Sequence, residues 1–135
     1  MRVLATCAVV FTIAGCGTTV RVESTGVSYP ANPVNCEIAL FRKDVPPTEP
    51  YETLGKIEAH VARNVFLGGM PLVEAETHRE LREQACQLGA NAVVIDESVE
   101  SSVIEMRHIH VWARALRIPD RGTPPPDAKA PESKE

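Results

Sequence analysis

Regular alternation of apolar and polar residues is confined to residues 35–118, and this limits the chain to one small folded domain. A core built from so short a segment buries little hydrophobic surface, so its stability is marginal unless a crosslink is added. Residues 16–34 mix Thr, Ser, Gly and Pro, which predicts a flexible tether with at most a short extended piece at residues 20–22. Residues 119–135 are rich in proline and lack apolar periodicity, which predicts a disordered tail. A polyproline recognition segment is the alternative for this tail.

The chain begins with an apolar leader. Arg2 is followed by the uncharged residues 3–14, and the run closes with Ile13-Ala14-Gly15-Cys16. This run is shorter than the roughly 20 apolar residues that a membrane-spanning helix needs. Residues 1–15 resemble a bacterial lipoprotein signal peptide with its lipobox. The resemblance implies that the thiol of Cys16 is alkylated with diacylglycerol, that the chain is cut before Cys16, and that the freed amine is acylated with a fatty acid such as palmitate.

The same resemblance implies a place in the cell envelope. Gly17, and not Asp, follows the cysteine, and in Gram-negative lipoproteins this favours sorting to the outer membrane, facing the periplasm. Each buried acyl methylene contributes about 0.8 kcal/mol, so more than one acyl chain gives stable anchoring. The membrane is therefore the first expected partner, through the lipid anchor.

The four cysteines fit an exported protein. Cys7 lies in the leader and Cys16 carries the lipid, so Cys36 and Cys86 remain in the mature chain. A pair of cysteines in a small exported domain is usually a disulfide, and we predict a Cys36–Cys86 bond. Chain entropy alone assigns the loop that this bond closes, residues 36–86, about 4 kcal/mol of stabilisation. Two buried free thiols are the alternative.

The core segment predicts an α+β fold, with a sheet of about four strands and one main amphipathic helix packed on one face. We expect strands at residues 36–41, 51–62, 92–96 and 103–118, a proline-rich loop at residues 45–50, a turn at residues 64–70 and a polar hairpin at residues 97–102. Pro71 is expected to begin the helix, because proline suits a first helical position, and Gly89 is expected to end it.

The last predicted strand has two contrasting faces. Alternation places Ile109, Val111, Ala113 and Ala115 on one face, where the alanines leave room for the helix to lie close. The opposite face combines apolar, aromatic and charged side chains: Met106, His108, His110, Trp112, Arg114 and Leu116. A mixed face of this kind either contacts solvent or is shared with a partner.

The order of these motifs resembles a known family. Residues 51–57 (YETLGKI) precede the helix, residues 81–94 (LREQACQLGANAVV) end it and begin a buried strand, and Ala113-Arg114-Ala115 closes the last strand. Together they look like the small module shared by the YbjQ-like proteins and the Rcs-phosphorelay outer-membrane lipoprotein sensor. The resemblance implies a tethered sheet-and-helix domain with structural disulfide bonding. It also implies that the domain senses or relays envelope stress by contacting other envelope proteins.

Charge and motif content narrow the expected function. Eighteen acidic residues against 14 basic ones, with no basic patch interleaved with aromatics, argue against nucleic acid as a partner. The chain lacks His-Glu-x-x-His, Gly-x-Ser-x-Gly and a phosphate-binding glycine loop, so we do not expect an enzyme. The favoured function is a noncatalytic interaction or stress-sensing module. An envelope protein partner would contact the strand face around Met106 and Trp112, or the loop that contains Phe66.

His108-Ile109-His110 is the candidate metal site. Side chains at i and i+2 of a strand lie on one face, where two imidazoles can share a divalent ion. His60 and His78 are candidate third ligands, at distances that the sequence does not fix. Two solvent-facing histidines without a metal are the favoured interpretation, and a small metal-binding lipoprotein is the alternative function. No other cofactor is expected.

Overall fold

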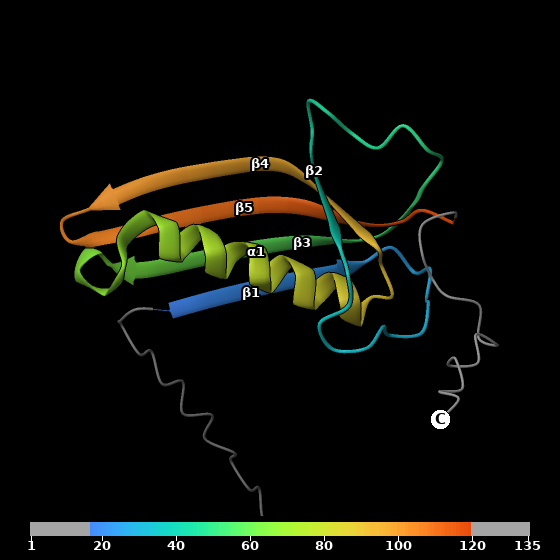
Figure 1. The fold of residues 1–135 in the computed structure, drawn as a ribbon, viewed down its shortest axis with the longest axis horizontal. Helices are drawn as coiled ribbons and strands as arrows, with labels where there is room; N and C mark the ends of the chain where they lie inside the picture. The colour runs from blue at the N-terminus through green and yellow to red at the C-terminus, as the bar shows by residue number, and fades with distance from the viewer. Residues whose placement is uncertain (1–16, 120–135) are drawn as a thin grey trace, which may run out of the picture.

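The computed structural model describes residues 17–119, which form a small α+β domain (Figure 1). One long helix, α1 (Gly69–Gln87), lies along one face of a single sheet. The sheet has five strands: β1 (Gly17–Ser24), β2 (Ala39–Arg42), β3 (Glu52–Asn64), β4 (Ala92–Val103) and β5 (Met106–Arg117). A short 3-10 helix, η1 (Val65–Leu67), joins β3 to α1. The leader, Cys16 and the tail from residue 120 onward lie outside the described residues.

The strand order is β1-β3-β5-β4-β2. β1, β3, β5 and β4 pair antiparallel with their neighbours, whereas β2 runs parallel to β4. A parallel pair needs a long crossover connection, and the chain makes it through β3 and α1. Within residues 17–119, no helix is long and apolar enough to cross a membrane.

The sheet has one strand more than the predicted number of about four. The additional strand is β1, which lies in the segment expected to be a tether and pairs with β3 from Gly17↔Ala62 to Ser24↔Gly55. Seven of its eight residues are exposed, so no apolar alternation marks it in the sequence. Hydrogen bonds to the edge of β3 hold it in place, and a polar edge strand of this kind is a common feature of soluble sheets.

β4 is also longer than the sequence predicted. The segment expected to be a polar hairpin, residues 97–102, continues the strand and pairs with β5 as far as Val103↔Met106. The chain reverses at Ile104, whose φ is 54°, a positive value typical of a tight hairpin turn. At the other predicted boundary, α1 begins at Gly69, two residues before Pro71, which therefore lies in the first helical turn.

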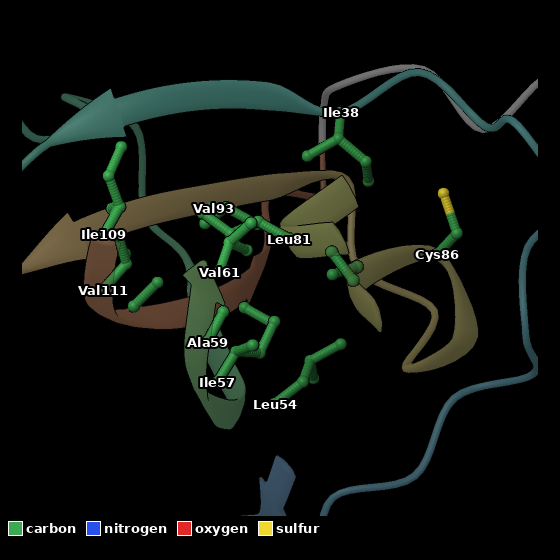
Figure 2. Close-up of a cluster of buried hydrophobic side chains, with 14 of the residues drawn as sticks. Ile38, Leu54, Ile57, Ala59, Val61, Leu81, Cys86, Val93, Ile109 and Val111 are labelled. Carbon is green, nitrogen blue, oxygen red and sulfur yellow. The ribbon is translucent and has the colours of Figure 1, made fainter. Parts of the chain in front are cut away.

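The core lies between α1 and the strands β3 and β5 (Figure 2). The predicted inner face of β5 is confirmed, because Ile109, Val111, Ala113 and Ala115 are all buried. Ile57, Ala59 and Val61 alternate onto the same side of β3. The helix contributes its apolar stripe, which consists of Val73, Thr77, Leu81, Ala85 and Cys86. The small residues in both strands let the helix backbone come close to the sheet.

The predicted disulfide is present and joins Cys36 to Cys86, with the two Cα atoms 5.9 Å apart. It ties the segment before β2 to the last turn of α1. The backbone N–H of Asn32 donates to the Cys86 carbonyl at 2.8 Å, and the Asn32 side chain donates to the Ala90 carbonyl at 2.6 Å. The segment between β1 and β2 is therefore fastened over the end of the helix by a covalent bond and by hydrogen bonds.

Candidate functional site

The face of the sheet that α1 does not cover, hereafter the open face, carries polar and aromatic side chains in rows. Residues directly opposite each other in an antiparallel sheet point to the same face. One row crosses β1, β3, β5 and β4 as Thr19, His60, His110 and Val99, and the next as Arg21, Glu58, Trp112 and Glu97. All of these residues are exposed or half-buried. The open face is thus a continuous surface that solvent reaches.

Three histidines meet at the centre of the open face. His60 Nε2 and His108 Nδ1 lie 3.2 Å apart and share a hydrogen bond, and their rings stack with centroids 5.3 Å apart. The His110 ring lies 5.5 Å from that of His60 at an angle of 46°. Burial, followed by the charges of His108 and His110, lowers the pKa of His60. The cluster therefore favours the neutral form of its central imidazole.

His110 connects the cluster to a carboxylate and to the tryptophan. Its Nε2 lies 2.8 Å from Glu58 Oε1, and its ring stacks on Trp112 with centroids 4.0 Å apart. These two contacts fix the imidazole plane, and the stacked imidazole covers part of the indole. The remaining indole surface is half-buried and borders the neighbouring row of charged residues.

A hollow of about 280 Å³ lies beside the indole. Its lining includes one aromatic ring, that of Trp112, and five charged side chains: Arg21, Lys56, Glu23, Glu58 and Asp96. Within residues 17–119, neither Arg21 nor Lys56 forms an ion pair, whereas Glu58 contacts His110. The hollow therefore offers two basic side chains next to an apolar ring, with Arg21 opposite Glu58 and Lys56 opposite Glu23 across the paired strands.

Asp96, which also lines this hollow, forms an ion pair with Arg114. Arg114 donates from Nε to Asp96 Oδ2 and from Nη2 to Asp96 Oδ1, both at 2.8 Å. These hydrogen bonds raise the pKa of the Arg114 guanidinium. Asp96 reaches Arg114 because a bulge interrupts the pairing of β4 between Ile95 and Glu97. The guanidinium is thus committed to structure and is not free to bind a ligand.

A second hollow, of about 320 Å³, lies over the histidines and is lined by Thr19, Arg21, Glu58, His60 and His110. His108 and His110, the predicted metal pair, lie on this face together with His60. His78 lies on α1, on the other side of the sheet, and so takes no part. Among residues 17–119, no group of three or more His, Cys, Asp or Glu side chains is arranged to hold a metal ion.

The residues predicted to form an interface are separated in space. Trp112 occupies the middle of the open face, whereas Met106, the first residue of β5, lies at one end of the sheet and pairs with Asn64 and Val103. Phe66 lies in η1 at that same end. Leu116, which the sequence placed on the mixed face, is fully buried in a second apolar cluster with Ala92, Val94 and Ile118. The accessible part of the mixed face therefore stops before Leu116.

Sequence reasoning missed the roles of Arg21 and Glu58. Arg21 lies in the segment predicted as a tether, and Glu58 meets His110 only through the register of β3 against β5. The alternation of residues 56, 58 and 60 marks them as one side of a strand, but nothing in the sequence fixes which residue of another strand faces them.

The fold is similar to that of a Francisella virulence factor, FvfA, known from a crystal structure in an orthorhombic form. The two chains share 9% sequence identity with a TM-score of 0.53, and the match covers 72% of this chain and 97% of the FvfA chain. At this identity the likeness shows a shared fold alone. No protein-family model matches the chain, and no curated protein matches its sequence.

Proposed function

We propose that this protein is a lipid-anchored envelope lipoprotein whose domain binds another envelope protein through the open face, without catalysis. One observation carries the proposal: Arg21 and Lys56, two positive charges without ion-pair partners among residues 17–119, flank the half-buried ring of Trp112. Tryptophan and arginine are the residue types most often found at the energetic centre of a protein interface. The partner that fits is a protein that places an apolar side chain on Trp112 and presents polar groups of both charges to the surrounding basic and acidic residues.

The surroundings of Trp112 support binding through this hollow. Stacking on His110 holds the indole in one orientation, so little conformational entropy is lost when a partner covers it. The neighbouring guanidinium, that of Arg114, is already paired with Asp96. An acidic side chain of the partner would therefore meet Arg21 or Lys56, and not Arg114, while Glu58 and Glu23 beside them would accept hydrogen bonds from donors of the partner.

The anchor of the proposed lipoprotein is Cys16, which is expected to carry the lipid that holds the protein in the outer membrane, facing the periplasm. The Cys36–Cys86 disulfide supports this location, since disulfides persist in oxidising compartments outside the inner membrane. A domain held at the membrane in this way can relay envelope stress when its partner is gained or lost.

Site-specific photocrosslinking in intact cells tests the binding face. A photoreactive residue at position 19 of the full chain, beside Arg21 on the open face, is compared with one at position 83, an exposed site on α1. We expect a discrete adduct from position 19 alone, and we expect Arg21→Glu and Trp112→Ala to abolish it while the melting temperature stays within a few degrees. Equal adducts from both positions, or an adduct that survives both substitutions, would contradict the proposal.

The anchor has its own test. The intact mass of the mature protein should correspond to a chain that begins at Cys16 and carries acyl groups, and Cys16→Ala should abolish flotation with membranes. A mature chain with an unmodified Cys16 thiol would overturn the lipoprotein assignment without touching the binding face.

A second candidate function is divalent metal binding at His108 and His110, whose rings both lie close to that of His60. The imidazoles would have to turn, since His60 and His108 bond to each other. Calorimetric titration of zinc or copper into the full chain tests this, with His108→Ala/His110→Ala as the comparison. Identical weak binding by the two proteins excludes the site.

A further inference from the structure

Exposed apolar side chains gather at one end of the sheet. They belong to η1 and to the turn between β4 and β5, and their exposed fractions are high: Phe66 78%, Leu67 61%, Val103 58% and Ile104 93%. The two loops are neighbours, because the backbone N–H of Val65 donates to the Glu105 carbonyl at 2.8 Å. Figure 1 shows both loops together at the left end of the sheet. We call these four side chains the apolar tip.

The first strand starts at this same end. Gly17 pairs with Ala62, two residues before β3 ends, and the Arg63 side chain donates to the Thr18 hydroxyl at 3.2 Å. Figure 1 shows the start of β1 at the end of the sheet that carries η1 and the β4–β5 turn. β3 spans 13 residues, so the opposite end of the sheet lies about 40 Å away.

Cys16 immediately precedes Gly17 in the chain. Consecutive Cα atoms are about 3.8 Å apart, so a lipid on Cys16 would be attached within one residue of the sheet. No tether of the predicted length separates the anchor from the domain, since β1 begins at Gly17. The end of the domain that carries the apolar tip is therefore the end that faces the lipid.

We propose that the apolar tip inserts into the interfacial region of the membrane that holds the anchor, an inference that rests on the proposed lipidation of Cys16. Insertion removes from water the apolar side chains that the fold leaves exposed, and it adds to the anchoring by the acyl chains. Arg63 is neutralised by its ion pair with Glu76 at 2.8 Å, and Glu105, in the turn itself, is exposed and can remain among the lipid headgroups.

This placement gives the domain an orientation. The strands stand away from the membrane, and the open face with Trp112 points sideways, where a partner in or near the same membrane can reach it. The loop between β2 and β3, which includes Val45, starts beside the middle of β4 and so lies well away from the apolar tip.

Quenching by brominated lipids tests the insertion. The full lipidated chain carries Trp112→Phe, which removes the single tryptophan, and receives one reporter through Phe66→Trp, Ile104→Trp or Val45→Trp. Val45 is 67% exposed and serves as the matched control. In vesicles of phosphatidylethanolamine and phosphatidylglycerol with brominated acyl chains, we expect fluorescence at positions 66 and 104 to fall about twofold and fluorescence at position 45 to stay nearly unchanged.

The outcomes separate this inference from the lipoprotein proposal. Flotation with the same vesicles and the mass of the N-terminal residue report on the anchor. A chain that is lipidated and floats, but shows no difference in quenching between positions 66 and 45, overturns the insertion alone. A concentration-dependent dimer that shields position 66 without quenching also overturns it, because a second copy would then cover the tip. An unlipidated Cys16 overturns the lipoprotein proposal itself.

Discussion

His60 Nε2 and His108 Nδ1, 48 residues apart in the sequence, lie within 3.2 Å of each other on two adjacent strands of the open face. An imidazole nitrogen accepts a hydrogen bond only when it carries no proton, so at least one of the two rings must be neutral for this bond to form. The observed arrangement of the cluster therefore belongs to a state in which the three histidines are not all charged.

Stability should fall as the pH drops below about 6.5. The pKa of His60 is lowered in the folded state by burial and by the charges of His108 and His110. The unfolded chain then binds more protons at position 60 between the ordinary pKa and the lowered one. The contribution of His60 to the free energy of unfolding is fully present above the ordinary pKa and is lost as the pH falls toward the pKa of the folded state. Glu58, which pairs with His110, and Arg21 line the hollow over the histidines together with His60. They are the other charged groups that act on the His60 imidazole.

Thermal melts of the protein between pH 7.5 and pH 5 measure this effect, with His60→Gln as the control. Glutamine keeps a hydrogen-bonding side chain but does not titrate, so the melting temperature of the variant should depend less on pH. The explanation is wrong if the wild type and the variant show the same slope, or if stability rises on acidification.

Removing one partner of the Arg114–Asp96 pair should destabilise the fold. Asp96→Asn leaves a half-buried guanidinium with weaker hydrogen bonds, and the expected loss is about 1–2 kcal/mol of unfolding free energy. Chemical denaturation followed by circular dichroism measures it. Glu97→Gln removes a neighbouring negative charge that is exposed and should change the free energy by less than about 0.5 kcal/mol. Equal losses of unfolding free energy in the two variants would mean that the removal of a negative charge, and not the loss of the Arg114–Asp96 pair, changes the stability.

Loss of the disulfide should be a larger perturbation. The double variant Cys36→Ala/Cys86→Ala should lose about 3 kcal/mol, mainly because the unfolded chain regains the freedom that the crosslink removes. For a domain of this size, such a loss lowers the melting temperature by roughly 10–20 °C. Reduction of the wild type should reproduce the change. A melting temperature unaffected by both treatments would show that the hydrogen bonds of Asn32 suffice to fasten the segment.

Local sequence patterns predicted those features that depend on one element or on counting residues. Alternation in β5 identified its buried face correctly, and the cysteine count, together with the expected export of the chain, predicted the disulfide. β1 was predicted only as a short extended piece at residues 20–22, because its stability comes from hydrogen bonds to β3 and its side chains bury almost nothing. The outer half of β4 was assigned to a hairpin for the same reason, since its seven last residues are exposed.

The candidate site depended on information that the sequence does not carry. His108 and His110 could be placed on one face by their spacing, but their meeting with His60 and Glu58 requires the register between β3 and β5. Register is set by the packing of whole strands against α1. The sequence could therefore place the two histidines of β5 on one face, but the other residues of the site follow only from the pairing of the strands in the sheet.

Gly89 should tolerate alanine much less well than Gly69, although both have positive φ, at 75° and 62°. A Cβ at position 89 would lie 2.6 Å from the Pro30 carbonyl oxygen and 2.7 Å from Tyr29 Cβ, whereas a Cβ at position 69 meets nothing within 4 Å. Gly69→Ala should cost about 1 kcal/mol, the ordinary penalty of the left-handed conformation.

Gly89→Ala should carry that penalty and a further loss of about 1–3 kcal/mol, because the segment that crosses the end of α1 must move. Denaturant titration of both variants, with the disulfide intact, separates the two contributions by subtraction. Similar losses at the two positions would mean that the segment around Tyr29 and Pro30 yields freely, and that the Cys36–Cys86 bond alone keeps it over the helix end. A larger loss at position 89 would show that close packing also holds this segment in place.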